Sequence, residues 1–430
     1  MSSVGILGGG YVGLTTGAGL ACLGHDVVVI ETDDERRRCI TLGRAPFFEP
    51  GLDTIVGQEV RTGRLRATSF GEAPFDRFDY LFICLPTPQM ADGSADLSYV
   101  FCAINDCRVL LKPGSIVVSK STVPVGTARQ IIRCLARGDV TVVSNPEFLQ
   151  EGAAVKAFLE AERIVIGSDE PIKAQQVAAL FAGVGAQIHL IGLESAELAK
   201  YACNAFLATK LSFVNSISAL CELAGADVED VVAVMGSDSR IGSQFLTPGP
   251  GWGGSCFPKD LAALAHKASE LGLSFSILKA VAETNEATLE RVVDHVAEAV
   301  GVLEGSRVAV WGLAFKAGTS DVRNSPAVSI CRRLLGLGAQ VLAFDPQVKR
   351  VDGIEIAASM YEACEGADAL VVLTEWAEFS RADLSRVAKS APGAVVIDTR
   401  AVIGLAEAAD AGVVVWRLGK VRTEGRTDVG

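Results

Sequence analysis

The stretch that decides the fold is VGILGGGYVGLTTGAGLACLGHDVVVIETD, residues 4–33. It opens with a short apolar strand that runs into glycines, and residues 11–24 then have the small-residue pattern of a closely packed helix. Residues 25–33 follow as the next apolar strand. A strand, a helix and a second strand in this order indicate two parallel strands joined by a helical crossover.

The same alternation continues along the chain and returns, more weakly, after residue 305. Apolar strands alternate with segments of helical period in both halves, which is typical of parallel sheets with helices on both faces. We therefore predict an α/β fold with two doubly wound, Rossmann-like domains. The further expected strands are DYLFICLPTP (79–88), SIVVSKST (115–122), VTVVSNPE (140–147), RIVIG (163–167), RVAVWGLAF (307–315), AQVLAFDP (339–346), DALVVLTEW (368–376), AVVIDTR (394–400) and GVVVWRLG (412–419).

Between the two halves, strand signals vanish from about residue 193 to residue 300. Residues 194–226 could form one long helix of about nine turns. Such a helix commonly bridges domains or forms a dimer interface, although its apolar stripe fits an ordinary core equally well. The predicted organisation is a dinucleotide-binding domain at 1–192, a central helical domain at 193–300 and a second Rossmann-like domain at 301–430.

Composition narrows the classes of protein. A chain of 430 residues that is 49% hydrophobic can bury a sizeable core, and its net charge of −12 argues against nucleic-acid binding. The eleven cysteines form no Cys-x-x-Cys pair and the first residues lack a secretory pattern, so we expect a reduced, cytoplasmic protein. Because no uninterrupted run of about 18 apolar residues occurs, we expect no membrane span.

The glycines at the start predict a dinucleotide site. Gly8-x-Gly10-x-x-Gly13 follows a strand and opens a helix, and Glu31 closes the next strand. In this context the glycines let the backbone approach a pyrophosphate at a helix N-terminus, and the acid binds the ribose diol. Glu31 would repel the extra phosphate of NADP, so NAD is favoured. Arg36 to Arg38 weaken this preference, unless they only form a solvated helix face.

The second half carries cations where the first half carries its glycines. In VWGLAFKAGTSDVRNSP, Lys316 and Arg323 could neutralise a phosphate that this acidic protein would otherwise repel. We infer that this half binds a different phosphate-bearing molecule. The alternative is ordinary surface charge.

Cys256 is the strongest candidate for chemistry. It lies between a glycine loop and a helix start at Pro258, where the helix dipole and Lys259 favour the reactive thiolate. A lone cysteine is usually an inert small hydrophobe, and the other ten, such as Cys22, fit that description. With charged residues and glycines on its flanks, Cys256 is instead predicted to be a nucleophile.

Two further pairs of polar residues suggest a site. Lys200 and Asn204 lie four apart in the long helix and share one face, which is either solvated or, because Asn204 stands in an apolar stretch, part of a site. Glu147 and Glu151 follow a strand, at the edge where open parallel sheets bind ligands. Glu151 could equally cap the next helix.

Together these residues resemble the UDP-glucose/GDP-mannose dehydrogenase family over nearly the whole chain. The segments that carry the resemblance are GGGYVGL (8–14), FFEPGL (47–52), CLPTP (84–88), DGSADLSYV (92–100), KSTVPVGT (120–127), NPEFLQEG (145–152), ELAKYACNAFLATKLSFVNSI (197–217), SRIGSQFLTPGPGWGGSCFPKD (239–260), GLAFKAGTSDVRNSPA (312–327) and TEWAEF (374–379).

The resemblance implies oxidation of carbon 6 of a nucleotide-linked hexose to the uronate in two hydride steps, with two NAD consumed. Cys256 would form a thiohemiacetal with the aldehyde and then a thioester. Lys200 and Asn204 would stabilise oxyanion charge, and Asp260 would handle protons together with Lys200. Thr122 and Glu147 would act around the catalytic water.

The resemblance also implies binding residues, and it implies no metal. Those expected at the cofactor are Gly8, Gly10, Tyr11, Val12, Gly13, Glu31, Arg36, Pro86, Thr87, Ser121, Thr122, Glu151, Lys259 and Arg323. Those expected at the nucleotide sugar are Glu147, Phe148, Leu149, Lys200, Asn204, Arg240 from a neighbouring subunit, Phe245, Gly249, Gly253, Phe315, Lys316 and Arg400.

Some questions stay open at this point. GGSCFPKD favours the UDP-glucose branch of the family over the N-acetylhexosamine branch, but it does not fix the nucleotide base, so GDP- or dTDP-linked sugars are alternatives. A one-step hydroxy-acid dehydrogenase would not need Cys256 or the second doubly wound half. A non-catalytic sugar-nucleotide binder would not need the catalytic set. We expect a homodimer or higher homo-oligomer built on the long helix.

Overall fold

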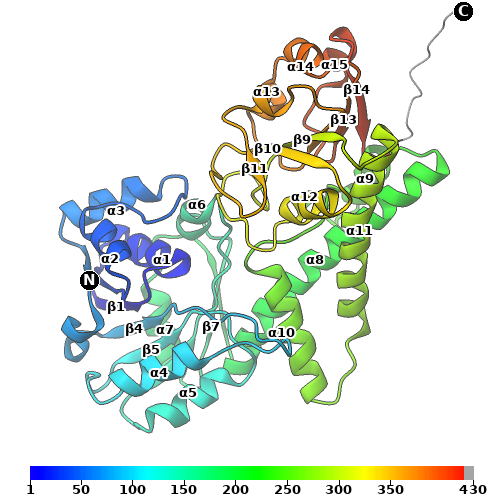
Figure 1. Cartoon of the computed structure of the whole chain (residues 1–430). Coiled ribbons are helices and arrows are strands. Elements are labelled where there is room, and N and C mark those ends of the chain that lie inside the picture. Colours follow the sequence, from blue (N-terminus) through cyan, green and yellow to red (C-terminus); the bar gives the residue numbers. More distant parts are fainter. Residues whose placement is uncertain (421–430) are drawn as a thin grey trace, which may run out of the picture. The chain divides into compact units, whose positions relative to one another are not determined.

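The computed structural model describes residues 1–420, and the chain falls into two compact units (Figure 1). The first unit comprises Met1–Cys203 with Lys259–Ser274, and the second comprises Asn204–Pro258 with the chain from Phe275 onward. Two of the three passages between the units occur inside helices, α8 (Leu193–Ala224) and α10 (Phe257–Glu270). The predicted division into three domains stays a prediction.

The first unit is built on an eight-stranded sheet of order β3-β2-β1-β4-β5-β6-β7-β8. Its first six strands have the 3-2-1-4-5-6 order of a dinucleotide-binding fold, so the doubly wound prediction is confirmed. The sheet departs from the parallel arrangement at one place, where β6 pairs antiparallel with β7 through Ser144 and Gly167. The strands are β1 (Ser3–Leu7), β2 (Asp26–Ile30), β3 (Leu65–Thr68), β4 (Tyr80–Ile83), β5 (Ile116–Ser119), β6 (Thr141–Ser144), β7 (Arg163–Gly167) and β8 (Gln187–Ile191).

The two outermost strands, β3 and β8, were not expected from the sequence. Both are edge strands of mixed polarity, LRAT and QIHLI, and neither forms the continuous apolar run of a strand buried on both faces. The helices of this unit besides α8 and α10 are α1 (Tyr11–Cys22), α2 (Asp34–Thr41), α3 (Leu52–Arg61), α4 (Ser98–Cys107), α5 (Thr127–Leu135), α6 (Ala154–Leu159) and α7 (Pro171–Ala179).

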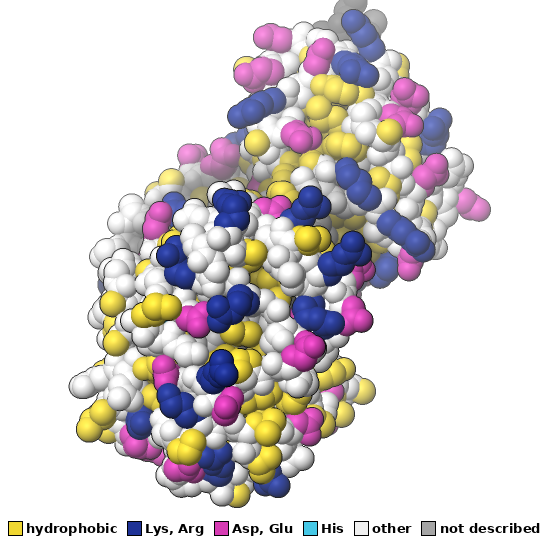
Figure 2. All heavy atoms as spheres, turned by 90° about the vertical axis from the view of Figure 1, so that its left-hand side faces the viewer, with side chains coloured by type: hydrophobic (Ala, Val, Ile, Leu, Met, Phe, Trp, Pro, Cys, Tyr) yellow, Lys and Arg dark blue, Asp and Glu magenta, His cyan; other side chains and the backbone are white. Residues whose placement is uncertain are grey.

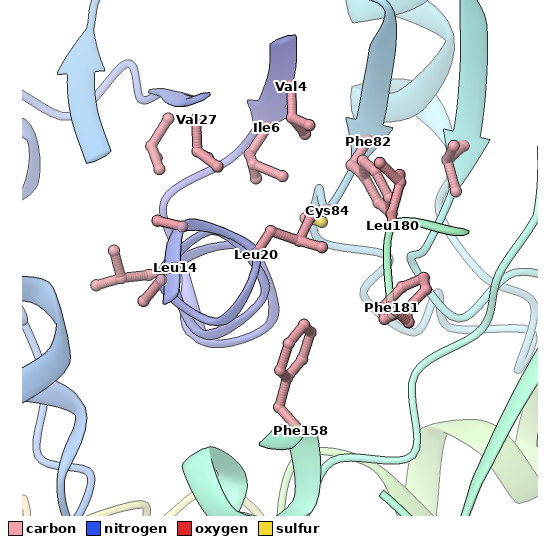
Figure 3. Close-up of a cluster of buried hydrophobic side chains, with 14 of the residues drawn as sticks. Val4, Ile6, Leu14, Leu20, Val27, Phe82, Cys84, Phe158, Leu180 and Phe181 are labelled. Carbon is pink, nitrogen blue, oxygen red and sulfur yellow. The ribbon is translucent and has the colours of Figure 1, made fainter. Parts of the chain in front are cut away.

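Small residues let α1 pack closely against its neighbours. Leu14 and Leu20 of this helix are fully buried in the cluster of hydrophobic side chains drawn in Figure 3. A Cβ on Gly19 would lie only 2.3 Å from ring carbons of Phe158 in α6. The glycines of the opening stretch therefore fix both the dinucleotide turn and the packing of the helix that follows it.

Helix α8 contains 32 residues and confirms the predicted long helix. Among the described residues it is the one helix that is long and apolar enough to cross a membrane, a weak indication because core helices of soluble proteins pass the same test. Several polar side chains of α8 are buried, so the buried face of this helix is not an ordinary apolar stripe. They are Glu197, Lys200, Asn204, Ser212, Asn215 and Ser218.

The second unit repeats the Rossmann-like order. Its six-stranded parallel sheet runs β11-β10-β9-β12-β13-β14, again the 3-2-1-4-5-6 order. The strands are β9 (Arg307–Trp311), β10 (Gln340–Phe344), β11 (Glu355–Ile356), β12 (Ala369–Val372), β13 (Val395–Asp398) and β14 (Val414–Arg417). The helices are α9 (Val228–Ser237), α11 (Ser276–Val300), α12 (Pro326–Gly336), α13 (Met360–Ala363), α14 (Leu384–Ser390) and α15 (Leu405–Asp410).

Charged side chains of both signs share the surface. On the face drawn in Figure 2, Lys and Arg side chains are interspersed with Asp, Glu and hydrophobic side chains.

Candidate active site

The turn after β1 has the geometry of a dinucleotide cradle. Gly8 has a φ of +95°, which favours glycine, and a Cβ on Gly13 would lie 1.8 Å from the Gly8 carbonyl oxygen. A Cβ on Gly10 would meet nothing within 4 Å. Two of these glycines are therefore required by the fold, whereas Gly10 faces open space, where a bare backbone admits a pyrophosphate to the N-terminus of α1. The residues present thus fit a dinucleotide.

Glu31 directly follows β2, beside this turn, and is buried. Its Oε2 accepts the N–H of Gly9 at 2.8 Å, and its Oε1 accepts the N–H of Asp33 at 2.9 Å. Oε1 also accepts the Thr32 hydroxyl at 3.5 Å, whereas Oε2 keeps lone-pair capacity for a further hydroxyl donor. Arg37 donates to the carbonyl oxygen of Glu31 at 2.9 Å, whereas Arg36 is exposed on α2.

The loops after β4 and β5 lie at the same carboxyl edge of the sheet and are tied to each other. The Thr87 hydroxyl donates to the Thr122 carbonyl oxygen at 2.8 Å, and the Ser121 hydroxyl donates to the Leu85 carbonyl oxygen at 2.7 Å. These bonds fix the backbone of both loops beside the dinucleotide turn. Val12 in α1 and Pro86 belong to the same edge.

A buried cluster of charges follows β6. The Lys200 ammonium lies 2.9 Å from Glu147 Oε1 and 5.4 Å from the centre of the Phe148 ring. Glu147 Oε2 accepts the N–H of Leu149 at 2.6 Å. Burial alone would raise the pKa of Glu147, but the charge and hydrogen bond of Lys200, the Leu149 N–H and the charge of Lys120 lower it. The carboxylate is therefore held ionised.

Sequence reasoning missed Lys120, the second cation of this cluster. Its ammonium donates to Asn145 Oδ1 at 3.0 Å, and the Asn145 amide donates to the Val165 carbonyl oxygen at 2.8 Å. Burial lowers the pKa of Lys120 to about 8, and the charge of Lys200 acts in the same direction. A lysine directly after the buried strand β5 is a sequence signal that could have revealed it.

Helix α8 presents Lys200 and Asn204 one turn apart, and both are buried. A solvated polar face is therefore excluded as their explanation. One turn before Lys200, the buried Glu197 accepts the N–H groups of Gly126 and Ala128, each at 2.7 Å, at the N-terminus of α5. Burial raises the pKa of Glu197 to about 7 against these two hydrogen bonds.

The first turn of α10 carries another buried carboxylate. Asp260 is 1% exposed, and the Lys259 ammonium lies 2.6 Å from its Oδ1. Burial raises the pKa of Tyr201 on α8, and the negative charges of Asp260 and Glu197 raise it further. Asp260 therefore faces the same stretch of α8 that carries Lys200.

Glu151 and Tyr11 lie near a carboxylate that the sequence analysis did not consider. Glu49 accepts the N–H groups of Gly152 and Ala154, the latter the first residue of α6. Glu49 therefore caps this helix, the role considered as an alternative for Glu151. It also accepts the Tyr11 hydroxyl at 2.6 Å.

In the second unit, Cys256 ends a glycine loop and immediately precedes α10, as predicted. A Cβ on Gly253 would lie 2.0 Å from the Asn324 carbonyl oxygen, and one on Gly254 would lie 2.9 Å from the Phe315 ring. The glycines thus let this loop approach the turn after β9. Cys256 is partly exposed, and its sulfur lies 3.6 Å from the Ser255 hydroxyl oxygen.

The other ten cysteines range from buried to exposed. Burial raises the pKa of four of them to about 12, which makes them inert thiols. The description of all ten as inert core residues was wrong for Cys22 and Cys102, because both are exposed at helix surfaces. The four thiols with a raised pKa are Cys84, Cys107, Cys331 and Cys364, and Cys221 is buried as well.

The turn after β9 resembles the turn after β1, because its backbone N–H groups also donate to an acid that follows the next strand. Gly312 has a φ of +98°, and the N–H groups of Leu313 and Ala314 donate to Asp345 Oδ2 at 2.8 and 3.1 Å. Asp345 follows β10 as Glu31 follows β2. The Leu313 and Ala314 N–H groups already donate to Asp345, so they are not available to bind an anionic ligand. An anion bound in this half therefore needs cationic side chains. This acid was also missed by the sequence analysis.

The expected sugar-nucleotide cations differ in their surroundings. Lys316 has its ammonium 5.7 Å from the centre of the Phe315 ring. Arg323 forms an ion pair at 2.6 Å with Asp321 and is largely exposed. Arg400 donates through Nε to the Leu373 carbonyl oxygen at 3.0 Å. A Cβ on Gly249 would lie 2.9 Å from Arg400 Nη1, so the arginine packs flat on that glycine.

Two expected substrate residues lie on the loop after α9. Arg240 pairs with Asp238 at 2.6 Å, and its side chain is 88% exposed. Phe245 has a φ of +60°, a left-handed conformation that a bulky residue adopts only under local constraint. Within residues 1–420, no group of three His, Cys, Asp or Glu side chains is arranged to hold a metal ion.

The fold and the glycine turn define an NAD-dependent oxidoreductase, and the comparisons agree. The chain belongs to the UDP-glucose/GDP-mannose dehydrogenase family. It matches the family's NAD binding domain over residues 2–184, its central domain over residues 194–287 and its UDP binding domain over residues 309–404. The chain therefore binds NAD and a nucleotide sugar.

Individual relatives support this membership. The chain is 41% identical to a UDP-glucose 6-dehydrogenase of Rhizobium meliloti, over 92% of this chain and 94% of that protein. It is similar to the structure of a UDP-glucose dehydrogenase from Pyrobaculum islandicum, with a TM-score of 0.89 and 34% identity over 98% of both chains. A UDP-D-ManNAc dehydrogenase from Pyrococcus horikoshii gives a TM-score of 0.88 and 27% identity, over 98% of this chain and 100% of that chain.

Proposed function

We propose that this enzyme oxidises UDP-glucose at carbon 6 to UDP-glucuronate in two steps at one site. The Rhizobium meliloti relative, 41% identical to this chain, is a UDP-glucose 6-dehydrogenase, and the segment GGSCFPKD favours the same substrate. The observation that carries the two-step chemistry is the position of Cys256, which ends a glycine loop directly before the N-terminus of α10. There the helix dipole favours the thiolate, the reactive form of a cysteine.

In the first step, the alcohol at carbon 6 loses a proton and a hydride and becomes the aldehyde. The Cys256 thiolate then adds to the aldehyde carbon, and loss of a second hydride converts the thiohemiacetal into a thioester. Water attacks the thioester carbonyl, the carbon–sulfur bond breaks, and the thiolate leaves. Substrate and water together release two hydrides and three protons, and the product is the uronate. When bound, NAD accepts the hydrides.

The proposed roles follow from burial and charge. Lys200 and Asn204 donate from one face of α8 to the oxygen that gains negative charge, where a buried donor is most effective. Glu147 stays ionised beside Lys200 and orients the attacking water together with Thr122. Asp260 acts near Tyr201, next to Lys200 on α8, and assists proton transfer together with Lys200.

The binding roles of the remaining residues are also proposals. The glycine turn with Tyr11, Val12 and Glu31 binds the dinucleotide. The other cofactor contacts are proposed for Arg36, Pro86, Thr87, Ser121, Glu151, Lys259 and Arg323, and the sugar-nucleotide contacts for Phe148, Leu149, Arg240, Phe245, Gly249, Gly253, Phe315, Lys316 and Arg400. The Asp321 ion pair makes Arg323 the weakest of these assignments.

Another nucleotide hexose is the second candidate substrate, because a UDP-D-ManNAc dehydrogenase has nearly the same fold similarity. The deciding experiment incubates the enzyme with NAD and a panel of UDP-, GDP- and dTDP-hexoses and counts the NADH formed per sugar consumed. We expect two NADH per UDP-glucose. A higher kcat/KM for another sugar would overturn the substrate assignment, and one NADH per sugar would overturn the two-step mechanism.

Substitution of the cysteine tests the covalent step. We expect Cys256→Ala to abolish uronate formation, and Cys256→Ser to retain the first hydride transfer but stall before the acid. Cys102→Ser is the matched control, because it removes an exposed thiol elsewhere. Single-turnover NADH yield with mass analysis of the sugar and the protein reports both steps. Uronate formation by Cys256→Ala at the parent rate would show that this thiol is not the nucleophile.

We also propose that the active form is at least a dimer built on α8. Four large apolar side chains lie exposed at intervals of seven or eight residues along this helix, namely Leu198, Phe206, Phe213 and Leu220, and Leu223 is exposed three residues further on. This apolar surface suits a second helix of the same kind. Sedimentation of the active enzyme at assay concentration tests the assembly, and a fully active monomer would refute it. The cytoplasmic location stays a prediction, and we also propose a role in polysaccharide biosynthesis.

A further inference from the structure

Glu49 forms a hydrogen-bonded clamp that the proposed chemistry does not use. It lies in the loop before α3, and its side chain is buried. Its Oε2 accepts the Tyr11 hydroxyl at 2.6 Å and the Gly152 N–H at 2.7 Å. Its Oε1 accepts the Ala154 N–H at 2.7 Å. A single carboxylate thus serves three donors from two distant parts of the chain.

One arm of the clamp reaches the dinucleotide turn. Tyr11 is the first residue of α1 and directly follows Gly10, the glycine with open space at its Cβ position. Its ring packs against Phe47 with the ring centroids 5.4 Å apart. Burial and the hydrogen bond to Glu49 raise the pKa of Tyr11, so the hydroxyl stays protonated and continues to donate.

The other arm reaches the segment that carries Glu147. Gly152 ends NPEFLQEG and has a φ of +82°, and Ala154 begins α6. The N-cap residue of α6, Ala153, contributes no side-chain hydrogen bond, so Glu49 supplies the cap from outside. Tyr11 also lies with its hydroxyl oxygen 3.2 Å from the Gln150 carbonyl oxygen, so both arms meet beside this segment.

We infer that Glu49 is a positioning residue that fixes the dinucleotide turn and the sugar-binding segment in register with each other. The inference rests on the proposed function for its sugar arm, whereas its cofactor arm rests only on NAD binding. An ionised oxygen accepting short hydrogen bonds from both segments holds them more firmly than neutral contacts would. Loss of the Glu49 carboxylate should therefore weaken the binding of both NAD and the nucleotide sugar. Loss of the Tyr11 arm alone should weaken only the binding of NAD.

Two substitutions separate the arms. Tyr11→Phe removes only the hydroxyl and keeps the ring against Phe47, so we expect the Kd for NAD to rise about threefold to tenfold. The KM for the nucleotide sugar should change less than about twofold. Glu49→Gln replaces one of the two acceptor oxygens with an NH₂ group, which is a donor. This group would then lie against a backbone N–H, which is also a donor. Both constants should then rise at least about threefold.

The matched control is Tyr80→Phe, which removes a hydroxyl that contacts the Gln176 carbonyl oxygen at 3.3 Å. It should leave both constants unchanged. In Tyr11→Phe/Glu49→Gln, the Kd for NAD should rise by less than the product of the two single increases, because both substitutions act on the same Tyr11–Glu49 contact. Calorimetric titration with NAD measures this arm without turnover.

The outcomes are distinguishable. A lower Tm with both constants unchanged would show that Glu49 is merely structural, and a Tyr11→Phe variant that binds NAD like Tyr80→Phe would also overturn the inference. If the parent enzyme oxidised no nucleotide sugar, the proposed function would fail, while the NAD titrations would still decide the cofactor arm.

Discussion

Replacing Lys200 with methionine tests the buried ion pair of the candidate site. The side chains of Lys200 and Glu147 are 5% and 6% exposed, and their charged atoms lie 2.9 Å apart. Methionine preserves much of the volume but removes the ammonium, which leaves the Glu147 carboxylate buried beside Lys120 alone. Removing one partner of such a pair typically costs about 3–5 kcal/mol. For a unit of roughly 200 residues, this lowers Tm by roughly 7–12 °C.

The stability lost in Lys200→Met should be larger at high pH than at low pH. In the parent, the pKa of Glu147 is lowered, so the pair stabilises the fold above the unfolded carboxyl pKa and loses this contribution as the pH falls. Without Lys200, burial dominates and the pKa of Glu147 should rise. The variant then loses stability as the pH rises through that value. We therefore expect a larger difference in Tm between parent and variant at pH 7.5 than at pH 5.5.

A double-mutant cycle separates charge from shape. Glu147→Gln keeps an acceptor for the Leu149 N–H and removes the charge, so Lys200→Met/Glu147→Gln should regain much of the stability lost in Lys200→Met. Activity should not return, because both groups are proposed to act in the reaction. The measurements are thermal unfolding at both pH values and kcat. A double variant as unstable as Lys200→Met, or a pH-independent loss, would refute an uncompensated carboxylate as the cause.

Two further predictions concern the first unit. Gly13→Ala should lower Tm, because its Cβ would lie 1.8 Å from the Gly8 carbonyl oxygen, whereas Gly10→Ala should fold like the parent and raise the Kd for NAD by at least about tenfold. Thermal unfolding and NAD titration check both, and equal effects in the two variants would contradict the cradle geometry. Burial lowers the pKa of His25, against its hydrogen bond to the Leu180 carbonyl oxygen, so stability should fall as the pH drops below about 6.5. His25→Gln should flatten this dependence by at most about 1.4 kcal/mol per pH unit, and an unchanged slope would contradict it.

Local patterns were enough to predict most of the architecture. Apolar runs separated by helical segments predicted the strands that are buried on both faces, and the helical period predicted α8 within two residues at each end. The edge strands β3, β8 and β11 and the antiparallel step between β6 and β7 were missed. Edge strands have no fixed apolar pattern, and strand direction depends on pairing partners that lie far apart in the sequence.

The sequence by itself determined the dinucleotide turn and the place of Cys256. Both depend on neighbours within a few residues, because a glycine turn and a helix start are local structures. Only the tertiary structure decided that Lys120 joins Glu147 and Lys200, and that Glu49 bonds Tyr11 and the start of α6. Glu49 lies 38 positions from Tyr11 and 105 positions from Ala154 in the sequence. Such contacts depend on the order of the strands in the sheet, and burial in that sheet is what gives the charges their strength.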